Sequence, residues 1–263
     1  MTFSSILADN NKTRVIIALD NLTEVEVMQF IEKLDPDYCK LKIGKELFVR
    51  YGPQLIKRLQ QHGYDIFLDL KFLDIPHQVA GAVTAAAELG VWMVDVHALG
   101  GARMLQAARQ ALDDYAQQQH AEGKQIRLPL LIAVTILTSF TANDLHQIGL
   151  GGEPQHHVLH LAKLAQSAGM DGVVCSAHEA AMLRAELGQT FCLVTPGIRL
   201  PHDASIQTAK RISDEDDQRR IMTPEQALQA GANYLVMGRS IRHLEKPLEF
   251  LQAINNRTYE KRC

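Results

Sequence analysis

Three charged residues interrupt an apolar run that extends from Phe67 to Pro76. Asp69, Lys71 and Asp74 lie in the segment FLDLKFLDIP, whose other residues are mostly typical of a buried strand. Successive side chains of a strand alternate between its two faces, so Asp69 and Lys71 are expected on the same side. Removing a carboxylate and an ammonium from water is costly, and an apolar pair would serve stability as well. The pair therefore indicates catalytic chemistry, with a structural ion pair as the alternative.

Strand-like and helix-like segments alternate along almost the whole chain. Apolar runs rich in β-branched residues predict strands at Arg14–Asp20, Tyr38–Ile43, Asp65–Lys71, Trp92–His97, Leu130–Leu137, Gly172–Cys175, Phe191–Thr195 and Tyr234–Met237. Segments of helical period lie between them, at Glu24–Leu34, Glu46–Gln61, Gln78–Leu89, Ala102–Gln119, His178–Leu187, Pro224–Ala230 and Pro247–Ile254, with an irregular helical stretch across Asn143–Ala168. Eight such repeats in about 250 residues are typical of a (β/α)8 TIM barrel. An open doubly wound sheet is the alternative.

The length and composition favour one folded unit. The chain has 263 residues, 46% of them hydrophobic, and barrels of this size form a single domain, here expected over residues 1–263. We expect a short N-terminal extension at residues 1–13. The stretch at about residues 199–218 has no helical or strand pattern, and a loop of that length in a compact domain is typically a functional lid.

The charge and residue pattern disfavour several classes of protein. The formal net charge is −3 and no basic stripe is interleaved with aromatic residues, so nucleic acid is not an expected partner. No apolar stretch reaches the roughly 18 residues of a membrane span, and the N-terminus lacks a signal-peptide pattern. The cysteines, none in C-x-x-C spacing, indicate a reducing cytoplasm without disulfides or a zinc site; they are Cys39, Cys175, Cys192 and Cys263.

The predicted barrel brings the polar ends of its strands to one rim. Because barrel enzymes build their active sites at the C-terminal strand ends, these residues are expected to converge. Each of them alone also fits a helix cap or a turn. Residues of this kind end seven of the predicted strands: Asp20, Lys42, Asp69 with Lys71, His97, Thr138, Arg199 and Arg239.

The last two of these strand ends predict a phosphate site. Gly197 and Gly238 lack side chains, so their backbone N–H groups can approach an anion closely. The loops after strands seven and eight are the usual phosphate cradle of barrels. Arg199 and Arg239 add two positive charges that can bind phosphate oxygens bidentately.

Six strings in the sequence closely resemble bacterial orotidine 5′-phosphate decarboxylases. They are IALD at 17–20, LKIG at 41–44, FLDLKFLDIP at 67–76, VTPGIR at 194–199, DQRRIMTP at 217–224 and VMGR at 236–239. The likeness runs from about residue 14 to about residue 254. It implies a homodimeric barrel enzyme that converts orotidine 5′-phosphate to uridine 5′-phosphate and carbon dioxide in pyrimidine synthesis, with no metal or organic cofactor.

The resemblance also implies a role for each matching charged residue. Lys71 would deliver a proton to C6 of the pyrimidine, and Asp69 would lie beside the substrate carboxylate. Lys42 would join this charged row and bind a ribose hydroxyl. Loss of carbon dioxide leaves a carbanion at C6 with little resonance help, so a fixed ammonium would stabilise charge that grows in the transition state. Asp74 would act in the partner subunit's site.

The remaining substrate contacts are implied in the same way. Asp20 would bind the ribose, Thr138 the pyrimidine edge, and Ile75 would reach across to the partner subunit. Further contacts, including those that close over the phosphate, would come from Pro196, Arg199, Gln218, Gly238 and Arg239. The chain departs from the usual pattern at His77-Gln78, where Asn-Thr is common, and at Leu99, where a smaller residue is common.

Two other functions stay open at this point. A magnesium-dependent sugar-phosphate decarboxylase or aldolase of the same suprafamily also uses the motif D-x-K-x-x-D. Its metal site, however, requires a carboxylate at the position where this chain has Lys42. A non-catalytic barrel that binds a phosphate ligand would tolerate the loss of Asp69 or Lys71, and both are present.

Overall fold

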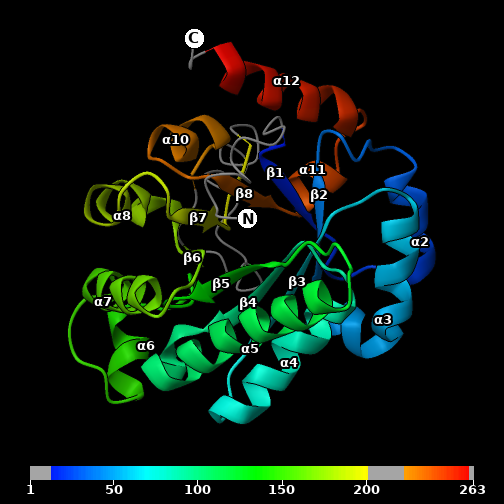
Figure 1. Ribbon diagram of the computed structural model, residues 1–263. Coiled ribbons are helices and arrows are strands. Elements are labelled where there is room, and N and C mark those ends of the chain that lie inside the picture. Colours follow the sequence, from blue (N-terminus) through cyan, green and yellow to red (C-terminus); the bar gives the residue numbers. More distant parts are fainter. Residues whose placement is uncertain (1–12, 201–221, 261–263) are drawn as a thin grey trace.

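The computed structural model describes residues 13–200 and 222–260, which form a closed barrel of parallel strands (Figure 1). The strands follow one another around the barrel in sequence order, and the last pairs with the first. They are β1 (Val15–Ala18), β2 (Lys40–Gly44), β3 (Ile66–Phe72), β4 (Met93–His97), β5 (Leu130–Val134), β6 (Gly172–Val174), β7 (Cys192–Thr195) and β8 (Tyr234–Met237). The predicted (β/α)8 barrel is confirmed, and the open sheet is excluded.

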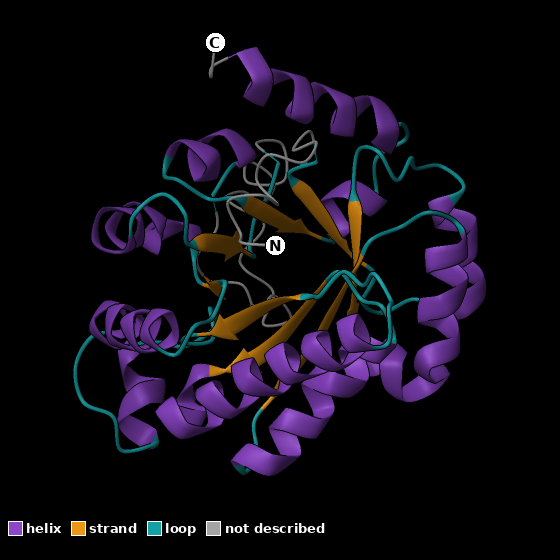
Figure 2. Ribbon diagram, in the orientation of Figure 1, coloured by secondary structure: helices purple, strands orange, loops and turns teal. Residues whose placement is uncertain are grey.

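Helices surround this barrel on the outside (Figure 2). They are α2 (Glu24–Ile31), α3 (Lys45–Gln61), α4 (Pro76–Glu88), α5 (Gly101–Ala121), α6 (Ala142–Gln147), α7 (Pro154–Ser167), α8 (Ala180–Leu187), α10 (Pro224–Gln229), α11 (Arg239–Arg242) and α12 (Pro247–Glu260), with short 3-10 turns η1 (Ala98–Gly100) and η2 (Ala177–Glu179). Proline stands at the first turn of several of them, where its missing N–H costs nothing. None of the helices within the described ranges is long and apolar enough to cross a membrane.

The core has two apolar layers because the strand side chains alternate in direction. One face of each strand packs against the helices, as Ile17 and Leu41 do. The other face fills the barrel itself, where Ile16, Phe67 and Met93 form a separate cluster. Side chains thus fill the interior of the barrel.

The structure corrects four details of the predicted elements. The helix expected over Glu46–Gln61 is interrupted at Gly52, whose φ of 59° is left-handed, because Pro53 follows and cannot continue a regular helix. The strand expected to reach Leu137 ends at Val134. The irregular stretch resolves into α6 and α7, separated by a glycine-containing loop, and α11 after β8 was not predicted.

Two predicted segments fall largely outside the described residues. All of the N-terminal extension except Thr13 lies there, as does the lid from residue 201 onward. The lid residue Gln218 is among them.

Strand β3 is irregular at the charged residues. Leu68 pairs with Val94, yet the next pair joins Phe72 to Val96, so three residues of β3 face a single residue of β4. Lys71 lies within this bulge and has a φ of 53°. A side chain in the left-handed region costs roughly 1–3 kcal/mol, which the surrounding structure must offset. Simple strand alternation therefore does not describe the backbone at Lys71.

Candidate active site

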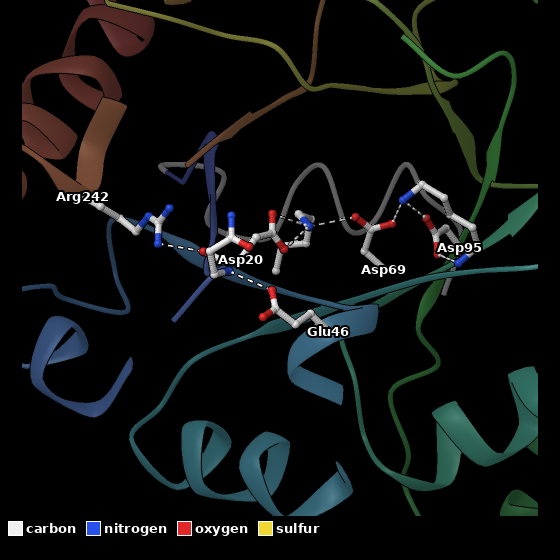
Figure 3. A network of polar contacts seen from close by, with 8 residues as sticks. Asp20, Glu46, Asp69, Asp95 and Arg242 are labelled. Carbon is white, nitrogen blue, oxygen red and sulfur yellow. Dashed lines mark hydrogen bonds and ion pairs between the residues drawn. The ribbon is translucent and has the colours of Figure 1, made fainter. Parts of the chain in front are cut away.

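A row of alternating charges crosses the C-terminal end of the barrel, as Figure 3 shows in part. The Lys42 Nζ atom lies 2.9 Å from Asp69 Oδ2 and 3.1 Å from Asp20 Oδ1. The Lys71 ammonium contacts the other oxygen of Asp69. Asp69 therefore bridges two lysines from neighbouring strands, and the predicted contact between Asp69 and Lys71 is present.

Burial makes these charges strongly interdependent. The side chains of Lys42 and Asp69 are only 10% and 11% exposed, whereas that of Lys71 is 27% exposed. Burial alone would lower the pKa of Lys42, but the Asp69 and Asp20 carboxylates outweigh it and raise the pKa to about 12. Burial would raise the pKa of Asp69, yet the two ammonium groups hold it well below its usual range. Both groups are thus charged at neutral pH.

The local backbone makes room for this row. Gly44, at the end of β2, lies so close to the ion pair that a Cβ atom there would be 2.8 Å from Asp20 Oδ1 and 3.4 Å from Lys42 Nζ. Any larger residue would displace the Asp20 carboxylate. The Asp20 backbone is held from the other side, because Arg242 Nη1 donates a hydrogen bond to its carbonyl oxygen at 2.8 Å.

The charged row opens into a cleft of about 490 Å³, large enough for a small organic ligand. The cleft brings together nearly all predicted site residues that the structure describes: Asp20, Lys42, Asp69, Lys71, Thr138, Pro196, Arg199, Gly238 and Arg239. A larger hollow of about 1680 Å³ opens at the opposite end of the barrel. Its charged groups pair with one another, as Lys40 does with Asp65, and barrel chemistry belongs at the C-terminal end.

Two predicted residues lie apart from this cleft. Asp74 and Ile75 follow the end of β3 and are exposed instead of lining the cleft of their own chain. The Asp74 carboxylate accepts a hydrogen bond from the Ile75 N–H at 2.6 Å, which fixes the turn into α4.

Sequence reasoning missed two residues around the site. Asp95, on β4, is fully buried and accepts a hydrogen bond from the Lys71 N–H. A charged residue inside the apolar string MVDVH is the same signal that marked Asp69, so the sequence could have revealed it. Arg242 carried no such signal, because α11 was not predicted and its contact with Asp20 spans 222 residues.

The comparisons with known proteins identify the same family over the length of the barrel. The sequence profile described as "Orotidine 5'-phosphate decarboxylase / HUMPS family" matches residues 13–254. The chain belongs to this family. An orotidine 5′-phosphate decarboxylase of Neisseria meningitidis serogroup C is 50% identical over 252 residues, covering 96% of this chain and 95% of that protein. One from Escherichia coli O127:H6 is 51% identical over 255 residues, covering 97% and 96%.

A solved structure supports the same family at the level of the fold. The crystal structure of orotidine 5′-phosphate decarboxylase from Lactobacillus acidophilus matches with a TM-score of 0.75 and 35% sequence identity, covering 92% of this chain and 97% of that chain. Membership of the family therefore explains both the barrel fold and the six matching strings of the sequence. The part of this family member that the structure describes holds no group of three or more histidine, cysteine or acidic residues placed to hold a metal ion.

Proposed function

We propose that this chain converts orotidine 5′-phosphate to uridine 5′-phosphate and carbon dioxide in the described cleft, with Lys71 protonating C6. The activity is that of the family and its curated relatives: the chain is an orotidine 5′-phosphate decarboxylase, a carboxy-lyase of pyrimidine biosynthesis. The observation that supports the residue assignment is the charged row in which Asp69 bridges Lys42 and Lys71.

The proposed reaction needs only the substrate, Lys71 and a proton from solvent. The bond between C6 and the carboxylate breaks, and its electron pair stays on C6. A proton then moves from Lys71 Nζ to that carbon, and Lys71 regains one from solvent. The ammonium stabilises charge that develops only in the transition state, which is how an electrostatic group accelerates a reaction most effectively. Asp69 would stand beside the departing carboxylate and hold both lysines in place.

The other cleft residues would bind the rest of the substrate. Asp20 and Lys42 form an ion pair at the cleft wall and are proposed to bind the ribose hydroxyls. Thr138 is proposed for the pyrimidine edge. The phosphate would be bound by the residues after β7 and β8, namely Pro196, Arg199, Gly238 and Arg239, together with Gln218. Phosphate contacts remote from C6 would supply binding energy for excluding water from the reaction.

We further propose a homodimer with shared sites. Leu73 and Ile75 flank Asp74 and are 53% and 63% exposed, and Leu99, after the neighbouring β4, is 44% exposed. Large apolar side chains exposed beside a strand end are typical of a surface that another protein covers. A two-fold axis here would present Asp74 to the partner subunit's cleft, since each surface meets its own copy. A cytoplasmic location is part of the proposal, because the cysteines Cys39 and Cys192 are free thiols and buried.

The activity is tested directly by following the loss of absorbance of orotidine 5′-phosphate with purified protein in a buffer containing a chelator. We expect full turnover under these conditions. An absolute requirement for magnesium would instead favour the sugar-phosphate decarboxylase or aldolase, whose carboxylate position is occupied here by Lys42 in its ion pair with Asp69. Tight binding of uridine 5′-phosphate without turnover would favour the non-catalytic barrel.

Arg239→Ala is expected to raise KM about 10- to 100-fold and to lower kcat less, because a charge-assisted contact to phosphate acts through binding. Arg127→Ala is the matched control. Arg127 is an exposed arginine that pairs with Asp65 at the opposite end of the barrel, so its loss should leave both constants near the parental values. An unchanged KM in Arg239→Ala would move the phosphate site elsewhere.

A further inference from the structure

Asp95 is a buried carboxyl group beside Lys71 to which the proposed reaction assigns no role. Its side chain is completely buried. It follows Met93 by two positions on β4, so both side chains point into the barrel, where Met93 packs in the apolar interior cluster. A further apolar side chain would extend that packing, whereas a buried polar group is costly unless it makes hydrogen bonds. The presence of a carboxyl group here therefore needs a specific reason.

The reason lies in the bulge of β3. Regular pairing between β3 and β4 is interrupted from Leu68 to Phe72, so the backbone groups of the bulge need other partners. The Lys71 N–H donates a hydrogen bond to Asp95 Oδ1, with 2.7 Å between nitrogen and oxygen. A side-chain oxygen thus takes the place that a backbone carbonyl of β4 has in a regular sheet.

This hydrogen bond holds the Lys71 backbone in the conformation that directs the lysine side chain. The φ of 53° at Lys71 is unusual for a residue other than glycine and persists only where neighbouring groups determine it. From this backbone the Lys71 ammonium reaches Asp69, and Nζ lies 3.9 Å from Asp95 Oδ2. We propose that Asp95 is the positioning residue of Lys71, fixing the bulge through its acceptor oxygen; this inference rests on the proposed role of Lys71 as proton donor.

The surroundings of the Asp95 side chain shift its pKa. Burial and the nearby Asp69 carboxylate raise the pKa of Asp95 well above its usual range. Whether protonated or ionised, the carboxyl group has an oxygen that can accept the Lys71 N–H, so the acceptor role does not require a negative charge. Asparagine has nearly the same shape and an equivalent acceptor oxygen. Asp95→Asn should therefore reproduce the function, although it can never carry a negative charge.

The test compares Asp95→Asn with Asp95→Leu, which keeps the branched arrangement of heavy atoms but removes the acceptor. We expect Asp95→Leu to lower kcat about 100-fold, because a displacement of about 1 Å at the reacting group has this effect. Its KM and its affinity for uridine 5′-phosphate should stay within about threefold of the parent, since the phosphate contacts are remote. Asp95→Asn should keep kcat within about threefold of the parent.

Asp171→Ala is the control for the loss of a side-chain oxygen that accepts a strand N–H. Asp171 Oδ2 accepts the Leu131 N–H at 2.7 Å, the same kind of bond at the same distance, but at the start of β6 and at the opposite end of the barrel. This variant should lose thermal stability and keep its kcat. A general loss of barrel stability would lower the melting temperature in both variants without separating their kcat values.

Two results would overturn the positioning role. One is a kcat near the parental value in Asp95→Leu, and the other is a loss in Asp95→Asn as large as in Asp95→Leu. If the leucine variant does not fold, Asp95→Asn and Asp95→Ala supply the same comparison, with melting temperature as the check. The parent and Lys71→Ala, measured in the same assay, test the proposed function separately from the role of Asp95.

Discussion

Lys71→Ala is expected to lower kcat about 1000-fold or more while leaving the affinity for uridine 5′-phosphate nearly unchanged. The ammonium acts on charge that appears at C6 only in the transition state, so its loss removes little binding of the uncharged product ring. Lys71 lies at the cleft and contacts Asp69, which also pairs with Lys42. The measurements are steady-state decarboxylation and calorimetric titration with the product.

Lys40→Ala is the matched control for this variant. Lys40 is a β2 lysine that pairs with Asp65 and lies 4.4 Å from the centre of the Trp92 ring, at the opposite end of the barrel. It shares the features of a strand lysine with a carboxylate partner but lies outside the cleft. Activity of Lys71→Ala within about tenfold of the parent would contradict the role of Lys71 as proton donor.

The second large effect concerns the exposed Asp74. If Asp74 completes the partner subunit's site, Lys71→Ala and Asp74→Ala homodimers should each be nearly inactive, and mixing them should restore activity. In a mixed dimer one site carries both substitutions and the other carries neither. Random exchange of equal amounts makes half of the dimers mixed, each with one intact site of two, so about a quarter of parental activity should return. Decarboxylation after verified subunit exchange is the measurement.

A second mixture controls for nonspecific recovery. Lys71 and Asp69 contact each other within one chain, so their substitutions fall in the same site. Mixing Lys71→Ala with Asp69→Ala leaves one lesion in every site of the mixed dimer, and no activity should return. If the Lys71→Ala and Asp74→Ala mixture also stays inactive, Asp74 serves its own chain and the shared-site proposal is wrong.

The sequence by itself determined the barrel and most of the lining of its cleft. Strand and helix periods are local properties, so the alternation of apolar runs with helical segments was readable along the chain. The parallel order then followed from repeated crossovers, and it placed every strand end on one rim. This is why Asp20, Lys42 and Lys71 could be assigned to one site before any distance was known, although their roles stay predictions.

Only the tertiary structure decided how these residues are held. The bulge that turns the Lys71 backbone depends on the register between β3 and β4, and strand periodicity carries no information about register shifts. The bond from Arg242 to the Asp20 carbonyl and the closeness of Gly44 to the Asp20 carboxylate depend likewise on how segments pack in space. Such contacts join residues far apart in the chain, so their geometry exists only once the barrel has closed.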